Sequence, residues 1–371
     1  MMAPAQVSSA PLLALLGHPE QAGQLPLRHW EGVLQRARSA GVASALSFRV
    51  LGACAPEDLD PRVVAHLQSA RRAGLARAQM ARWECSELAA VAADAGFPVL
   101  LLKGAAYLLG GHPFAVARFV SDVDLLVPKR HLRAMEDRLL AQGYAAVEMD
   151  AYDERYYRDW SHETPPLRHP GRPLEVDLHH TITPVTGSLR PDAALLFAAS
   201  QPLAGSPFRT LCPEDQVLHA CLHCFHDGDL NLRLREVVDI DALLRVCSER
   251  GDFAERLLQR AQVLGLQGPL WYGLHFARRW LDCPPAAAIL AALPGPPSWR
   301  RRCMDVLVPR AMLPADPERG DGLGVRLART ALLVRYHLLR MPLRLLLPHL
   351  ARKAWRRLLQ RLAKKAPVPE E

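Results

Sequence analysis

Two aspartates stand two residues apart in the apolar run SDVDLLV, and they suggest chemistry more clearly than any other pair in the sequence. Side chains alternate between the two faces of a strand, so Asp122 and Asp124 are expected to project from one face and Val123 from the other. Two carboxylates held side by side repel each other unless a cation lies between them. Mg²⁺ prefers oxygen ligands of this kind, so the pattern predicts a magnesium site.

A second feature precedes these aspartates. The apolar run Val99–Leu102 leads into Lys103 and Gly104, and a short helical pattern follows. Glycine lets the backbone approach a ligand closely. The free N–H groups at the start of a helix favour a phosphate. A phosphate site beside a metal site suggests chemistry on a nucleotide.

A further acidic strand is predicted in the run LEVDLHH. Alternation places Glu175, Asp177 and His179 on one face and the apolar residues on the other. With the segment Thr164–Arg168, this strand is expected to form a hairpin around the turn His169–Arg172. Strands mixed with helices in this way predict an α+β core with a mixed sheet.

Periodicity divides the chain into four segments. Residues 1–95 are expected to form a helical N-terminal segment, and residues 96–200 a catalytic core. Residues 201–313 are interpreted as a helical domain that closes the cleft, and residues 314–371 as a linker with a basic amphipathic tail. We therefore expect an α+β core, with a mixed sheet and flanking helices, between helical N- and C-terminal segments.

The run LLKGA, then Arg118, then SDVDLLV, and finally a V-D-L-H strand resemble the polymerase-β-like nucleotidyltransferase superfamily. The chain is most similar to bacterial nucleotidyltransferase-family proteins with the pattern LKG…R…SDIDLLV…DLH, which are often found with biosynthetic gene clusters. The resemblance covers roughly Arg71 to Leu244. The SDVDLLV run with an upstream glycine and a downstream acidic strand is the specific part of the match.

The resemblance implies a role for each matching residue. Asp122, Asp124 and Asp177 would be the catalytic carboxylates and would hold two Mg²⁺ ions, with Mn²⁺ as the alternative metal. Contacts with the nucleotide are implied for Lys103, Gly104, Ala105, Arg118 and Ser121. Reserve candidates are Glu175, His179 and His223.

Two features depart from the superfamily's usual pattern. The usual Gly-Gly or Gly-Ser pair is Gly104-Ala105 here, so a side-chain hydroxyl is missing although the backbone N–H remains. The gap from Gly104 to Asp122 is also longer than the common spacing. The positive charge of Lys103 is a candidate compensation at this position.

The expected function is Mg²⁺-dependent transfer of a nucleoside monophosphate from a nucleoside triphosphate, ATP or CTP, to an acceptor. The acceptor is open among a small molecule, a peptide, a glycan precursor and a protein. One alternative is phosphoryl transfer from the triphosphate at the same site. Another is a degenerate nucleotidyltransferase that serves as a membrane-surface or partner-binding module. Clustered acids without a metal would only repel one another, which argues against a degenerate site.

Composition indicates an ordinary globular chain of 371 residues, with 50% hydrophobic residues and a mean hydropathy of -0.02. No uninterrupted apolar run is long enough to predict a membrane span, and the first residues lack a basic signal-like region. The eight cysteines are scattered, which favours reduced thiols. We expect a cytoplasmic protein, either free or in peripheral contact with the inner membrane face.

Basic charge is concentrated at the C-terminus. Positions 322–371 contain twelve lysines and arginines against only Glu370 and Glu371, so the rest of the chain is about neutral. The tail interleaves leucine with arginine at helical spacing and is expected to be cut by Pro342 and Pro348. Such a helix favours an anionic membrane or an acidic partner. The alternative is a terminal helix packed on the body with its arginines in solvent.

Histidines and cysteines recur along the predicted helix that begins at Pro213. A zinc site is conceivable there, but packing of His219 and His223 toward the catalytic cleft, or pairing with Asp239 or Asp241, is the preferred interpretation. On the next helix, Arg235, Glu236 and Asp239 are candidates to close the cleft from the helical side.

Overall fold

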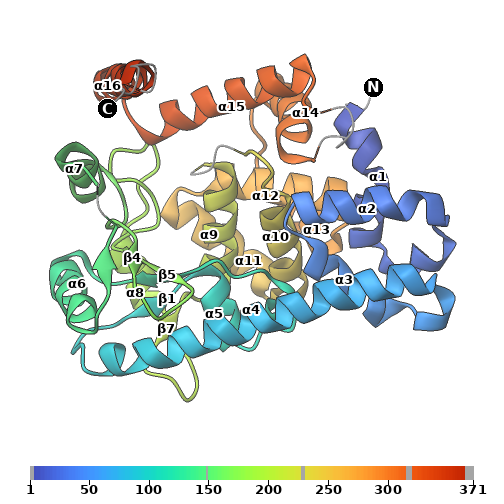
Figure 1. Ribbon diagram of the computed structural model, residues 1–371, viewed down its shortest axis with the longest axis horizontal. Coiled ribbons are helices and arrows are strands. Elements are labelled where there is room, and N and C mark those ends of the chain that lie inside the picture. The colour runs from blue at the N-terminus through green and yellow to red at the C-terminus, as the bar shows by residue number, and fades with distance from the viewer. Residues whose placement is uncertain (1–3, 148, 227–229, 315–319, 364–371) are drawn as a thin grey trace, which may run out of the picture.

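The computed structural model describes residues 4–147, 149–226, 230–314 and 320–363. Figure 1 shows a β-sheet on one side of the molecule, the N-terminal helices on the other, and further helices between them. A mixed sheet with flanking helices confirms the predicted α+β class.

Seven strands form one sheet in the order β3-β4-β5-β2-β1-β7-β6. Their bounds are Leu100–Leu101 (β1), Asp122–Leu126 (β2), Ala145–Ala146 (β3), Leu167–Arg168 (β4), Glu175–His179 (β5), Gln201–Pro202 (β6) and Arg209–Thr210 (β7). β2 is antiparallel to β1 and parallel to β5. The antiparallel pair of β4 and β5 confirms the expected hairpin. β6 and β7 extend the sheet beyond residue 200, where the catalytic core was expected to end.

The pairing of β2 with β5 determines which side chains share a face. Asp122 lies opposite Glu175, and Asp124 lies opposite Asp177. Paired residues on adjacent strands project to the same side of the sheet. The apolar residues that alternate with these acids, such as Val123 and Val176, are fully buried. Their burial fixes the register, because a slip of one residue would exchange the acidic and apolar faces.

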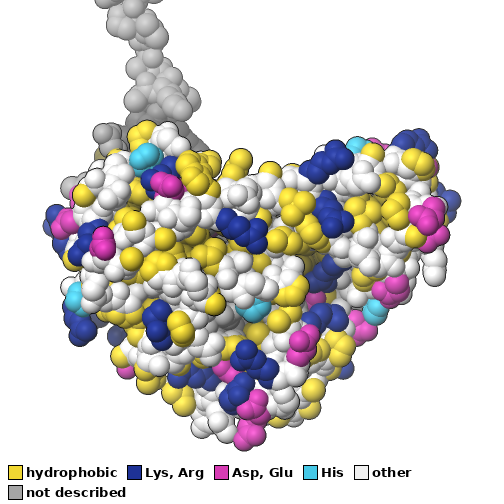
Figure 2. Space-filling view, turned by 90° about the horizontal axis from the view of Figure 1, so that it is seen from below, with side chains coloured by type: hydrophobic (Ala, Val, Ile, Leu, Met, Phe, Trp, Pro, Cys, Tyr) yellow, Lys and Arg dark blue, Asp and Glu magenta, His cyan; other side chains and the backbone are white. Residues whose placement is uncertain are grey.

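The N-terminal helices are α1 (Pro4–Gly17), α2 (Leu27–Ser39), α3 (Ala43–Ala53) and α4 (Pro61–Ala93). α4 begins where the Asp60 side chain accepts a hydrogen bond from the Arg62 backbone N–H, and Pro61 occupies a first-turn position that needs no donor. Its buried stripe includes Val63, Leu67 and Ala78. Seen from below in Figure 2, basic side chains form several separate groups with acidic side chains among them, as expected for a solvated face.

Four short helices accompany the sheet: α5 (Lys103–Leu109), α6 (Leu132–Ala141), α7 (Ala151–Trp160) and α8 (Ala193–Ala199). Six more form the predicted helical region: α9 (Pro213–Phe225), α10 (Leu234–Cys247), α11 (Phe253–Leu264), α12 (Gln267–Leu281), α13 (Pro284–Ala292) and α14 (Ser298–Met312). α9 packs against α10, α11 and α12. The run Asp227-Gly228-Asp229, which the sequence predicts to end the helix from Pro213, lies outside the described residues.

The tail consists of α15 (Leu323–Arg340) and α16 (Leu343–Ala363). Pro342 separates them as expected, but the prediction that Pro348 also cuts the tail is wrong, because Pro348 lies inside α16. α15 packs on α14 and buries Leu332. In Figure 1, α16 lies beside α7, where the buried His349 ring stacks on Tyr156. Part of the expected linker, residues 315–319, lies outside the described residues.

Among the helices that the structure describes, none combines the length and the apolar character needed to span a membrane.

Close packing of α9 against α12 depends on Gly273. A Cβ built there would overlap the Cys221 sulfur. We expect Gly273→Ala to lower the free energy of unfolding by about 1–3 kcal/mol, the usual range for overpacking. Chemical denaturation measures this change. Cys221→Ala should restore part of the loss in the double variant. Gly268→Ala in the same helix should have little effect, because a Cβ built there meets no atom within 4 Å apart from its chain neighbours and the backbone of its own helix. Equal effects of the two glycine substitutions would contradict this explanation.

Candidate active site

The site begins where β1 leads into α5. Lys103 adopts a left-handed backbone conformation with φ of 47°, which is uncommon for a residue with a side chain. The Leu102 backbone N–H donates to the Asp124 carbonyl at 3.0 Å and ties this turn to β2. Residues held in such strained conformations cluster at functional sites. The strain here turns the lysine back over the acidic face of β2.

Asp124 is the most enclosed of the predicted carboxylates, with only 2% of its surface exposed. The Lys103 Nζ lies 2.6 Å from Asp124 Oδ1, and the His179 Nε2 lies 3.0 Å from the same oxygen. Burial would raise the pKa of Asp124, but the Lys103 ammonium and the His179 hydrogen bond outweigh burial and hold the pKa well below its usual range. Asp124 is therefore ionised in the folded protein.

The Lys103 ammonium is charged for the complementary reason. Its burial would lower its pKa, but the carboxylates of Asp124 and Asp122 outweigh burial and raise the pKa above its ordinary value. The lysine thus supplies a fixed positive charge beside two of the three predicted catalytic acids.

Asp177 has a different environment, although it is paired with Asp124 across the strands. Its Oδ1 is buried and has no hydrogen-bond partner among the described residues. Burial, and then the negative charge of Asp124, raise the pKa of Asp177 to about 7. The fold thus places an acid where its charge is unfavourable unless a cation or a proton is present.

The other predicted residues of this face are less central. Asp122 is partly buried and accepts a hydrogen bond from the Ser121 hydroxyl at 3.0 Å. Ser121 therefore contacts an acid of the site. Glu175 lies opposite Asp122 in the sheet, but its carboxylate accepts a 2.6 Å bond from Arg168 Nε. Of the two acids on β5, Asp177 is the one left without such a partner.

A group of two histidines and a glutamate adjoins these acids, and His179 is the member that was predicted from the sequence. Glu163 pairs with His179 across a β-bridge, and ligand atoms of His162, Glu163 and His179 lie within 4.8 Å of one another. Burial lowers the pKa of His162 well below its usual range, and the nearby His179 adds to this effect. Burial would lower the pKa of His179 as well, but Asp124 and Glu163 outweigh it and raise that pKa. These three residues could hold a metal ion next to Asp124.

Arg118 connects the sheet to the helical region. Its Nε donates to Asp239 Oδ2 of α10 at 2.7 Å, and both side chains are buried. A Cβ built on Gly104 would overlap the Arg118 guanidinium. The close approach that Gly104 permits in this structure is therefore made by Arg118, whose end lies at the start of α5. Ala105, the other predicted nucleotide contact, is buried next to it in α5.

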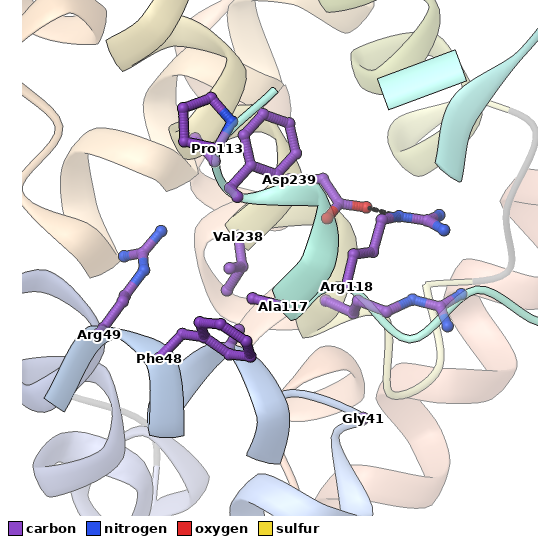
Figure 3. A pocket seen from close by; sticks show the side chains of 12 residues that line it. Gly41, Phe48, Arg49, Pro113, Ala117, Arg118, Val238 and Asp239 are labelled. Atoms are coloured by element: carbon purple, nitrogen blue, oxygen red, sulfur yellow. Dashed lines mark hydrogen bonds and ion pairs between the residues drawn. The ribbon is translucent and has the colours of Figure 1, made fainter. Parts of the chain in front are cut away.

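A cavity of about 240 Å³ adjoins this ion pair. Figure 3 shows Arg118, bound to Asp239, on one side of the cavity and Arg49 on the other, with Phe48 and Val238 between them. Arg235 also lines the cavity and donates to the Phe119 carbonyl at 3.1 Å. The cavity therefore has apolar walls and cationic edges.

His219 and His223 of α9 lie near enough to Lys103 for its charge to act on them, which agrees with the expected packing toward the cleft. Burial, and then the Lys103 charge, lower the pKa of both His219 and His223, that of His223 to about 4. Pairing with an acid was the other alternative, and His223 does pair with one, but with Glu236 in place of Asp239 or Asp241: its Nδ1 lies 3.3 Å from Glu236 Oε2. Asp239 is engaged by Arg118, and Asp241 by two other arginines, Arg49 and Arg245.

Most of the predicted residues thus meet in one place. The three catalytic candidates share one face of β2 and β5, and the Lys103 ammonium lies against them. Arg118 reaches the start of α5. Glu163 and His162 were missed because they lie in a segment without periodicity, and only long-range pairing brings them here. Asp239 appeared in the sequence only as a candidate for closing the cleft.

Comparison with known proteins adds one family. The family described as "Uncharacterised nucleotidyltransferase" matches residues 26–282, which is more than half of the chain. This match agrees with the resemblance that the sequence motifs carry. No curated protein matches significantly. The crystal structure of JHP933 from Helicobacter pylori is similar over 72% of this chain and 91% of its own, with 14% identity and a TM-score of 0.32.

The raised pKa of Asp177 has a consequence for stability. The folded protein holds this proton up to about pH 7, whereas the unfolded chain loses it near the ordinary value of 3.8. Without divalent cations, this group therefore makes the protein less stable as pH rises from about 4 to 7. In EDTA, the free energy of unfolding of Asp177→Asn should rise relative to that of the wild type by on the order of 2 kcal/mol as pH goes from 5 to 8.

Denaturant titration at each pH measures the difference between the two proteins, which removes the contribution of other titrating groups. Mg²⁺ should stabilise the wild type at pH 8 and leave Asp177→Asn nearly unchanged. A difference in stability that does not vary with pH would contradict the raised pKa of Asp177. Equal stabilisation of both proteins by Mg²⁺ would contradict a cation site at Asp177.

Proposed function

The chain belongs to the family of uncharacterised nucleotidyltransferases, and we propose that it moves a nucleoside monophosphate from a nucleoside triphosphate to an acceptor with the help of divalent cations. The single observation that carries this proposal is the buried carboxylate group on β2 and β5. Asp124 and Asp177 are paired in register, and Asp177 Oδ1 is buried without a hydrogen-bond partner among the described residues.

The donor set fits such cations. Asp122, Asp124 and Asp177 offer carboxylate oxygens from one face of the sheet, which suits Mg²⁺, with Mn²⁺ as the alternative. When bound, the cations would polarise the reacting phosphate and neutralise the pyrophosphate that leaves. The unfavourable charge of Asp177 beside Asp124 supports this assignment, because a cation would relieve it.

Two cations of the chain itself are positioned for the phosphates. The Lys103 ammonium is fixed at the acidic face, where it would contact a phosphate oxygen. Arg118 uses its Nε for Asp239, and its terminal nitrogens extend toward Gly104 at the start of α5. Charged donors held in place before the substrate arrives stabilise developing charge without reorganisation.

The neighbouring cavity is the proposed binding site for the nucleoside. It is of suitable size for a base, and Phe48 and Phe114 supply aromatic rings in its lining. Arg118 stands between this cavity and Gly104, so a nucleotide would extend from the cavity past the arginine to the acids. ATP and CTP remain the leading candidates.

Asp177 is the proposed base for the acceptor. A bound cation would keep Asp177 ionised and would lower the pKa of an acceptor hydroxyl beside it, and an ionised carboxylate within reach of that hydroxyl can take its proton. The proton would pass to Asp177 as the hydroxyl oxygen attacks the α-phosphorus and pyrophosphate leaves. The acceptor class, among small molecules, peptides, glycan precursors and proteins, is the open part of this proposal.

The test incubates the protein with each nucleoside triphosphate, Mg²⁺ and pools of these four acceptor classes, and reads the product by mass. We expect a gain of one nucleoside monophosphate and release of pyrophosphate. Asp124→Asn should lower the rate by about a thousandfold or more, since it removes a carboxylate that would hold the cations against the reacting phosphate. Asp137→Asn, an exposed aspartate on α6, is the matched control.

A product heavier by one phosphate would instead establish phosphoryl transfer at the same site. If no triphosphate binds in the presence of Mg²⁺ or Mn²⁺, the chain is a binding module and the proposal fails. Equal loss of activity in Asp124→Asn and Asp137→Asn would also contradict it.

A further inference from the structure

A second and larger cavity lies away from the carboxylates, between the C-terminal end of α9 and the helices α12, α14 and α15. Its volume is about 580 Å³, within the range of small-molecule sites. The apolar part of its lining includes Phe225, Tyr272, Met304, Leu307, Leu338 and Leu339. None of the residues assigned to the catalytic site lines it.

Two buried side chains of this lining each have one polar atom without a hydrogen-bond partner among the described residues. The Tyr272 hydroxyl has no hydrogen-bond partner among the described residues, although Tyr272 is only 5% exposed. The Nδ1 of His226, which is 4% exposed, is likewise unpartnered within the described chain, while its Nε2 lies 3.0 Å from the Ser188 hydroxyl. Buried polar groups in proteins are almost always satisfied, so these two atoms are where a further partner, a ligand atom or an ordered water, is expected.

Two charged residues, Arg300 and Arg335, are among the described residues of the lining, and both are cations. Arg335 is partly buried, and its NH1 donates to the Phe225 carbonyl at 2.8 Å. Burial, opposed only in part by Tyr272, lowers the pKa of Arg335, and Arg300 adds to the lowering. No aspartate or glutamate lines the cavity within the part of the chain that the structure describes. The nearby Asp305 is already engaged by His275 and Arg279.

We propose that this cavity binds an amphipathic anion, with a carboxylate or phosphate at Arg335 and Tyr272 and an apolar chain along Leu307 and Leu338. An anion would provide a counter-charge that the lining offers neither arginine within the described residues, and an acceptor for the tyrosine hydroxyl. A neutral or cationic ligand would leave these groups unsatisfied. The rest of the lining is apolar, so an anion with an apolar chain fits the cavity better than a purely polar anion does.

The position of the cavity links it to the tail. Arg335 and Leu339 belong to α15, and the Leu339 carbonyl accepts a hydrogen bond from the Ser188 backbone N–H at 2.9 Å. Thr186 donates to the Arg340 carbonyl one residue further along, also at 2.9 Å. A bound anion would therefore lie beside the contact through which α15 attaches to the segment after β5.

The test is calorimetric titration of the full chain with laurate and with dodecyl phosphate, below their micelle concentrations. Dodecanol and dodecyltrimethylammonium serve as neutral and cationic probes of the same chain length. We expect one anion to bind per chain, about tenfold or more tightly than dodecanol. The comparison of laurate with dodecyl phosphate identifies which headgroup the site prefers.

Arg335→Gln should weaken binding of the anion about tenfold, while Arg326→Gln, an exposed arginine on the same helix, should not change it. Tyr272→Phe keeps the ring and removes only the hydroxyl, so it should weaken binding without filling or opening the cavity. Leu307→Trp should block the cavity, which keeps the test valid if Arg335→Gln does not fold.

Failure of both anions to bind saturably, equal binding of dodecanol, or unchanged binding in both Arg335→Gln and Tyr272→Phe would overturn the proposal. Repeating the titration with Asp124→Asn separates this site from the catalytic one, since the anion should bind that variant normally. The outcome is thus independent of nucleotidyl transfer.

Discussion

The structure depends most on an electrostatic constraint, the crowding of carboxylates on two adjacent parallel strands. β2 and β5 place Asp124 directly opposite Asp177, and the buried valines and leucines on the other face prevent any slip that would separate them. In a poorly solvated environment, such charges repel strongly. The raised pKa values of His179 and Asp177 are consequences of this arrangement, and the left-handed turn at Lys103 holds an ammonium against the same carboxylates.

A second constraint connects this face to the helical region. Arg118 is buried and must have a counter-charge, which Asp239 of α10 provides. The arginine can lie there only because position 104 carries no Cβ. One glycine therefore determines how the turn before α5, the loop before β2 and α10 fit together. The apolar cavity beside Phe48 exists at the junction of these elements.

Local pattern was sufficient to predict the acidic strands, the hairpin and the helices, because alternation and helical periodicity act within a few residues. Alternation also placed Asp122 and Asp124 on one face of one strand and Asp177 on one face of another. Only the family resemblance brought the three together before the pairing of β2 with β5 was known. Glu163 and Asp239 could not be assigned in this way. Each reaches the site through pairing with a residue distant in sequence, His179 for one and Arg118 for the other. Pro348 was misjudged because a proline within a helix is usually disruptive, whereas α16 continues through it.

The central claim is that the carboxylates of β2 and β5 form a cation site, and crystals grown with Mn²⁺ and a non-hydrolysable nucleoside triphosphate test it most directly. We predict anomalous density bonded to Asp124 and Asp177, with the Lys103 ammonium on a phosphate oxygen. Density only at the neighbouring group of His162, Glu163 and His179, or none at all with Lys103 still on Asp124, would contradict the account.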